Sequence, residues 1–107
     1  MKSKQLKALW AAYAERVMQA TQGNLRATAA AMNANNNHRL KFQVTGRNIM
    51  QGNEVIYDGS NWGTIGELMG DEARMHAQDI AAEMAEGGAD EAEYLAELNR
   101  GYAQDRI

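Results

Sequence analysis

Residues 39–58 read RLKFQVTGRNIMQGNEVIYD, and this stretch decides the fold class. Apolar and polar side chains alternate over residues 39–45, which is typical of a strand with one buried face. A turn that begins at Gly46 leads toward a second strand over residues 54–58, with room for a short strand at residues 49–50. Strands joined this closely predict an antiparallel hairpin or a three-stranded meander.

The sequence before these strands predicts helices. Over residues 3–21 apolar side chains recur every three or four positions, which places one apolar stripe along a helix. Gly23 and Asn24 then favour a break, because glycine adopts the left-handed conformation that ends helices and asparagine caps the next helix. We therefore expect a second helix over residues 25–33. One continuous helix to residue 34 is the alternative.

The sequence after the strands also predicts helices. Residues 64–67, Thr-Ile-Gly-Glu, have the capping-box pattern that opens a helix, which predicts a helix over residues 65–86. Its expected apolar positions include Ile65, Leu68, Met69, Met75, Ile80 and Met84. Two glycines at 87–88 end this helix, and residues 90–104 form a last one with its own apolar stripe.

These elements predict an α+β fold: a small antiparallel hairpin or three-stranded meander flanked by an N-terminal helix, or helix pair, and two C-terminal helices. A chain of 107 residues has the size of one domain, here residues 1–107. Hydrophobic residues make up 45% of it, but 19 of them are alanine, so the core is small and a homodimer stays open. The aromatic residues expected in the core are Trp10, Tyr13, Tyr57 and Trp62, with Trp62 the most exposed.

Several function classes find no support in the composition. The chain has no cysteine, which favours an intracellular, cytoplasmic location, and it has no apolar run of the ~20 residues that cross a membrane. Glu72, His76 and Asp79 share one helix face, but one helix offers too few ligands for a metal. Because nucleophile and phosphate-binding motifs are missing as well, we expect no enzyme, no cofactor and no metal.

Charge is the most informative functional feature of this sequence. Residues 1–50 hold eight basic residues and one acid, giving +7, whereas residues 51–107 hold three basic residues and thirteen acids, giving −10. Asymmetry of this kind usually concerns partners and predicts a surface with two electrostatic poles.

The acidic half supplies the leading functional hypothesis. Carboxylates that repeat along a helix present negative charge much as a phosphate backbone does, so they fit a basic surface of another protein. The expected partner-binding residues are Asp79, Glu83, Glu86, Glu93 and Glu97. We expect a small non-enzymatic inhibitor, of the anti-CRISPR-like kind carried by phages and mobile elements. It would act as a DNA mimic and dock on a nucleic-acid-handling host protein or complex.

The basic half supports an alternative of a different class, a nucleic-acid-binding module. Its expected contacts to phosphates are Arg26, Arg39, Lys41 and Arg47, with hydrogen bonds from the asparagines at 35–37. The acidic total makes this less favoured than a protein partner. A further alternative is a subunit of a larger assembly, with the alanine-rich helices as contact faces. None of these hypotheses involves a membrane.

Residues 22–33, QGNLRATAAAMN, resemble the first part of a helix-turn-helix of the Fis type. The shared pattern is Gly-Asn, an alanine-rich packing helix and a turn after a large apolar residue, here Met32. This resemblance implies a following recognition helix for the major groove. However, it covers only about a dozen residues, since an asparagine-rich loop and an alternating strand come next.

Overall fold

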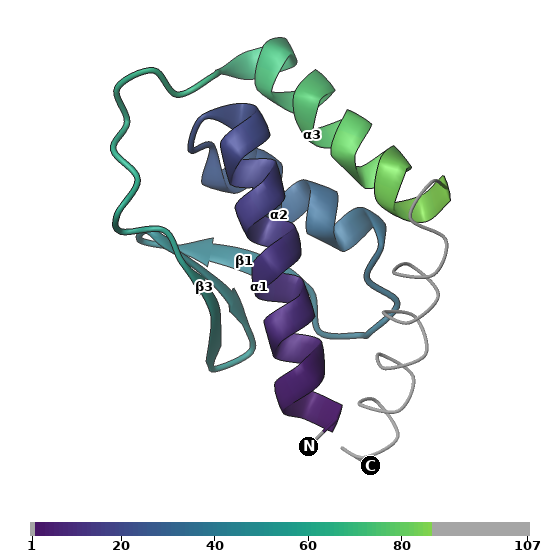
Figure 1. Cartoon of the computed structure of the whole chain (residues 1–107). Coiled ribbons are helices and arrows are strands. Elements are labelled where there is room, and N and C mark those ends of the chain that lie inside the picture. Colours follow the sequence, from purple (N-terminus) through teal and green to yellow (C-terminus); the bar gives the residue numbers. More distant parts are fainter. Residues whose placement is uncertain (1, 87–107) are drawn as a thin grey trace.

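The computed structural model describes residues 2–86, and side chains within residues 6–85. It contains helices α1 (Lys2–Thr21) and α2 (Leu25–Ala34), strands β1 (Phe42–Thr45), β2 (Asn48–Gln51) and β3 (Glu54–Asp58), and helix α3 (Gly70–Glu86) (Figure 1). The α+β fold with a helix pair before a three-stranded antiparallel meander confirms the prediction. The helix predicted over residues 90–104 lies outside the described residues.

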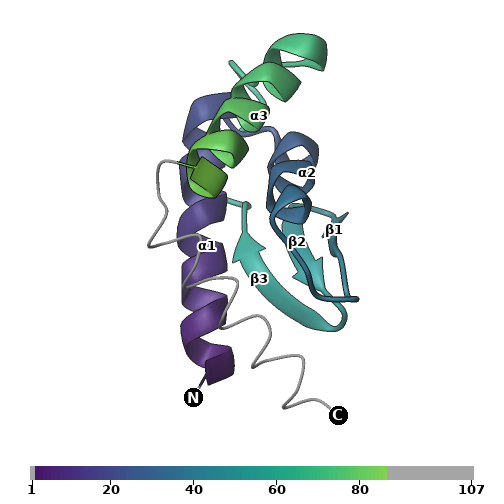
Figure 2. The same ribbon diagram turned by 90° about the vertical axis from the view of Figure 1, so that its right-hand side faces the viewer.

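Helices α1 and α2 cover one face of the sheet (Figure 2). The side chains of Phe42, Ile49 and Ile56 are buried beneath these helices, whereas Gln43 and Thr45 on the other face are exposed. Helix α3 packs on α1 and α2 and, among residues 2–86, makes no contact with a strand. The sheet therefore supports the helix pair, and the helix pair supports α3.

A β-bulge adjusts β3 to this core. Ile49 pairs with Tyr57 and Met50 with Val55, so Ile56 is the extra residue between two paired positions. A bulge of this kind changes the direction of the side chains that flank it. As a result Ile56 is buried, while Tyr57 beside it lies half-buried against α1.

The break between α1 and α2 follows the predicted chemistry. Gly23 adopts a left-handed conformation with φ of 99°, and its N–H donates to the carbonyl of Met18 at 2.8 Å. The side-chain oxygen of Asn24 then accepts from the N–H of Ala27, which caps α2. These two residues end one helix and begin the next within a single turn.

The asparagine-rich loop is a structural connection between α2 and β1. The amide of Asn33 donates to the carbonyl of Phe42 at 3.0 Å and accepts its N–H at 2.8 Å, as a neighbouring strand would. The carbonyl of Leu40 accepts from the side chains of Asn36 and Gln51. Because side chains replace ladder partners here, β1 begins at Phe42 and not at residue 39 as predicted.

Tyr13 joins the three helices at one buried point. Its hydroxyl donates to the carbonyl of Ala31 in α2 at 2.9 Å and accepts from the side chain of Asn35 at the same distance. Asn35 also donates to the carbonyl of Ala81 in α3 at 3.2 Å. Burial is the main cause that raises the pKa of Tyr13, so this hydroxyl stays protonated.

The prediction that a helix begins at residue 65 was wrong, because α3 begins at Gly70. Gly66 has φ of 85°, and the N–H of Glu67 donates to Thr64 in a turn, so the expected capping box does not form. The N–H of Leu68 instead donates to Thr21 at 3.0 Å, and its carbonyl accepts from Asn24 at 2.9 Å. These contacts hold the segment against the α1–α2 corner.

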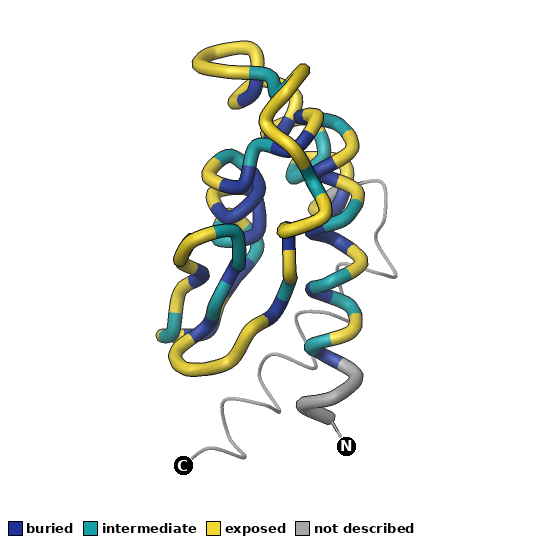
Figure 3. The backbone as a smooth tube through the Cα atoms, turned by 90° about the vertical axis from the view of Figure 1, so that its left-hand side faces the viewer, coloured by how far each residue is buried: buried dark blue, intermediate teal, exposed yellow. Residues whose placement is uncertain are grey.

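This correction changes which side chains belong to the core. Most of the connection over residues 59–69 is exposed (Figure 3). Ile65 is 99% exposed, Met69 67% and Met75 59%, although all three were expected on a buried stripe. Of the large apolar residues in the predicted helix, Met84 is buried, while Leu68 and Ile80 are half-buried.

Candidate functional site

Helix α3 has two sides with different chemistry. The side that packs on α1 and α2 carries the buried Ala73, Ala77 and Met84. An adjacent side exposes Glu72, His76, Asp79 and Glu83. Positions three or four apart share a helix face, so these polar residues form one outer surface. We call Glu72, Asp79 and Glu83 the acidic face of α3.

The carboxylates of the acidic face are largely free of basic partners. Glu83 lies 3.7 Å from Arg16 of α1, and both side chains are exposed. Glu72 and Asp79 take part in no ion pair among the described side chains. Exposed ion pairs contribute little stability, so the charge of this face remains directed toward solvent.

Only some of the predicted acidic residues lie in the described part of the chain. Asp79 and Glu83 lie on the acidic face, and Glu86 is the last residue of α3, with its side chain outside the description. Glu93 and Glu97 lie outside the described residues. Glu72 was not among the residues predicted to bind a partner. Within residues 2–86 no three of the His, Asp and Glu side chains converge as a metal site.

The four predicted nucleic-acid contacts do not form one cluster. Arg26 lies in the first turn of α2, and Arg47 lies near it, because the carbonyl of Arg47 accepts from Gly59, which packs on Leu25. Arg39 and Lys41 precede β1, next to the other end of α2. The asparagines at 35 and 36 hydrogen-bond within the protein. After α2 comes a strand and not a recognition helix, so the helix-turn-helix resemblance ends there.

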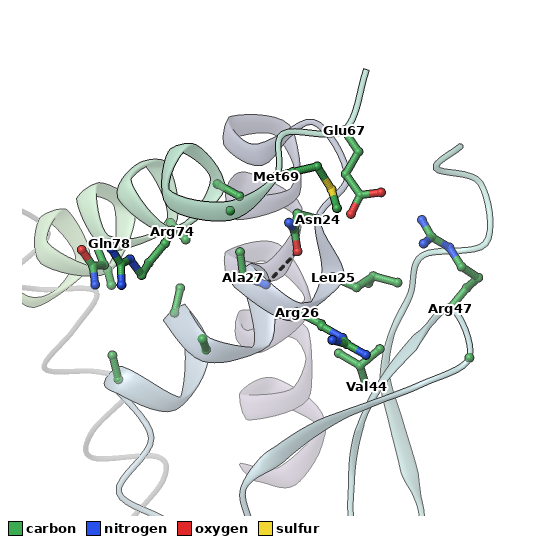
Figure 4. Close-up of a pocket in the computed structure, with 18 residues that line it drawn as sticks. Asn24, Leu25, Arg26, Ala27, Val44, Arg47, Glu67, Met69, Arg74 and Gln78 are labelled. Carbon is green, nitrogen blue, oxygen red and sulfur yellow. Dashed lines mark hydrogen bonds between the residues drawn. The ribbon is translucent and has the colours of Figure 1, made fainter. Parts of the chain in front are cut away.

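An open groove runs between α2 and α3, with a volume of about 880 Å³ (Figure 4). Ala27, Ala30, Ala31 and Ala34 line it from α2, and Ala73, Ala77 and Ala81 from α3. Ala31, Ala73 and Ala77 are buried where the two helices meet and form the base of the groove, whereas Ala30 and Ala34 are exposed along its α2 wall.

Three arginines from different elements surround this groove. Figure 4 shows Arg26 and Arg47 on the side of α2 and the sheet, and Arg74 on the side of α3. Glu67 is the acid that lines it. Arg74 was missed at the sequence level because it belongs to the acidic half. The available signal was the repeat of Ala73, Ala77 and Ala81 at four-residue spacing, which indicates a helix side with small residues next to Arg74.

A polar cluster fastens the connection after β3 to α1. The hydroxyl of Tyr57 donates to Glu15 at 2.7 Å and accepts from the indole N–H of Trp62 at 2.8 Å. Burial first, and then the hydrogen bond to Glu15, raise the pKa of Tyr57 to about 12. Arg47 holds the same connection by donating to the carbonyl of Trp62 at 3.1 Å.

This raised pKa predicts a specific alkaline instability. The pKa of Tyr57 lies above its ordinary value of 10.0, so the protonated hydroxyl stabilises the fold fully below about pH 10. That stabilisation is lost as the pH rises toward 12. We expect the free energy of unfolding, from urea titrations, to fall more steeply over this range in the wild type than in Tyr57→Phe. Parallel curves would contradict the assignment.

No helix within residues 2–86 combines the length and apolarity that a membrane crossing requires. Comparison of the chain with models of protein families, with curated proteins and with solved structures finds no match.

Proposed function

We propose that this protein acts by binding and that the acidic face of α3 docks on a basic surface of a partner protein. The observation that supports this proposal is the position of Glu72, Asp79 and Glu83, which are exposed on one side of a helix anchored by the buried Ala73, Ala77 and Met84. A helix anchored in this way already holds the backbone of these residues in place, so less conformational entropy is lost when a partner binds.

The spacing of these carboxylates suits an extended basic surface. Glu72 and Asp79 are seven residues apart, or about 10 Å along the helix axis, and Glu83 follows about 6 Å further on. Charges that are free of local partners produce a long-range field, which speeds association with a basic protein and makes it sensitive to salt. Such a field favours partners that are themselves strongly basic.

A protein that handles nucleic acid is the partner class most consistent with this proposal. Its binding channel is lined by lysine and arginine, and a row of carboxylates competes there with phosphates. Under this hypothesis the protein is an inhibitor of the anti-CRISPR-like kind. Short duplex DNA added to the complex is then expected to release the captured partner.

Charge reversal on the acidic face tests the proposal. We expect the variant Glu72→Lys, Asp79→Lys, Glu83→Lys to capture at least tenfold less partner from nuclease-treated extract of the native host, because attraction becomes repulsion. Capture is measured with the immobilised full-length protein by quantitative mass spectrometry. Nuclease treatment removes proteins that are bridged only by nucleic acid.

A matched control variant distinguishes the effect of the acidic face from the effect of the overall net charge. Asp79→Lys and Glu54→Lys each raise the net charge by the same amount, but Glu54 is exposed on β3, away from α3. Asp79→Lys is expected to weaken capture and Glu54→Lys to leave it unchanged. Equal effects of the two variants, or full capture by the triple variant, would show that the acidic face is not the docking surface.

A further inference from the structure

We propose that the groove between α2 and α3 binds an acidic amphipathic helix of a partner protein. This surface lies on the other side of α3 from the acidic face and has the opposite sign. It therefore constitutes a second binding site, whose occupant differs from the basic partner proposed above. Either proposal can be contradicted by experiment without affecting the other.

The shape of the groove suits a helix. Its α3 wall extends from Gly70 to Ala81, about 17 Å, which matches three turns of an incoming helix. Ala30 and Ala34 on the α2 wall are exposed, and on the α3 side Ala81 is half-buried, while Ala73 and Ala77 are buried at the base of the groove. Packed helices lie 8–10 Å apart depending on the side chains between them, so alanine walls allow close approach. Val44 and Leu25 add apolar surface at one end.

The positive charge around the groove indicates that a negatively charged molecule would bind there. Arg26 and Arg47 stand on one side and Arg74 on the other, while Glu67 is the carboxylate that lines the groove. Arg26 is exposed and takes part in no ion pair among the described side chains. Arg74 pairs with Asp71 at 2.8 Å, but both side chains are exposed, so this pair exchanges readily for a partner carboxylate.

The combination of apolar walls and arginines on both sides favours a protein helix over nucleic acid. A helix with small apolar residues along one stripe and glutamates on its flanks would fill the walls and pair with Arg26 and Arg74 together. A phosphate backbone would leave the exposed Ala30 and Ala34 of the α2 wall without an apolar surface to match them. Nucleic acid is therefore an outcome that the experiment must distinguish.

Because the sequence contains no cysteine, a single introduced cysteine allows one position of the full chain to be labelled. A trifluoromethyl tag on Ala30→Cys lies in the groove, and the same tag on Ala12→Cys lies on the exposed side of α1 and serves as control. The probe is a synthetic 15-residue helix with alanine and leucine on one stripe and glutamate on the flanks. A matched peptide has lysine at each glutamate position.

We expect the glutamate peptide to shift the fluorine resonance at position 30 and not at position 12, and the lysine peptide to shift neither. Arg26→Glu with Arg74→Glu is expected to weaken binding of the glutamate peptide about tenfold or more. Ala30→Trp, which fills the groove, is expected to abolish binding measured by anisotropy of a labelled peptide. The acidic-face variant should bind this peptide at least as well as the wild type, which keeps the two proposals separable.

Four results would overturn the proposal. They are equal binding of both peptides, no shift at position 30, a tighter and arginine-dependent shift with a DNA oligonucleotide, or a shift at position 30 that grows with protein concentration alone. The last two would assign the groove to nucleic acid or to a second copy of this chain.

Discussion

Trp10→Ala is expected to lower the free energy of unfolding by about 3–5 kcal/mol, the range found when a buried aromatic side chain is truncated. Trp10 is 1% exposed at the centre of the core. Its ring stacks on Tyr13 with centroids 5.7 Å apart and meets Phe42 edge-on at 4.8 Å. Removing the ring leaves a cavity where α1 meets β1. Urea unfolding followed by circular dichroism measures the loss.

Trp10→Phe provides the matched comparison. The indole N–H of Trp10 is buried without a hydrogen-bond partner in the described part of the chain, which itself costs free energy. Phenylalanine keeps an aromatic ring and removes that donor, so its effect should be less than half that of alanine. A loss below about 1 kcal/mol for Trp10→Ala would contradict the central position of this ring.

Gly59→Val is expected to destabilise the fold by about 3 kcal/mol, at the upper end of the cost of overpacking. A Cβ atom at position 59 would lie 2.8 Å from the carbonyl oxygen of Arg47 and 2.9 Å from Leu25. The N–H of Gly59 also donates to that carbonyl at 2.8 Å. The backbone of Arg47 cannot move away without breaking this bond, and Leu25 is held in the first turn of α2.

Gly63→Val is the control for that experiment, because a Cβ atom at position 63 meets nothing closer than 4.0 Å. Both glycines belong to the same connection, and only Gly59 is buried. Thermal unfolding of the two variants should therefore differ strongly, with Gly63→Val close to wild type. Similar losses in both would mean that backbone freedom, and not close packing, explains glycine at position 59.

The helices and strands of the first 58 residues were predictable, apart from the start of β1, because their signals are local. Periodicity marked α1, and Gly23 with Asn24 marked the break before α2. The start of α3 was not predictable in this way. Thr64 and Glu67 have the residue types of a capping box, but the backbone bond between Leu68 and Thr21 joins segments far apart in sequence. Tertiary contacts of this kind override a local capping signal.

The candidate site was predictable in part for the same reason. Helical spacing placed Asp79 and Glu83 on one face of a helix, and the structure has them there. The groove depends instead on how α2 packs against α3, which no local pattern reveals. Arg26, Arg47 and Arg74 come from three elements and meet only in the folded chain. Arg39 and Lys41 lie beyond the other end of α2 from Arg26.

The layered support of α3 has a consequence for its tolerance of substitutions. Since α3 rests on α1 and α2 and, over residues 2–86, contacts no strand, its solvent-facing residues are not constrained by strand pairing. Substitutions at those surface positions are therefore expected to leave the sheet and the helix pair beneath intact. The outer side of α3 can thus be redesigned separately from the frame that carries it.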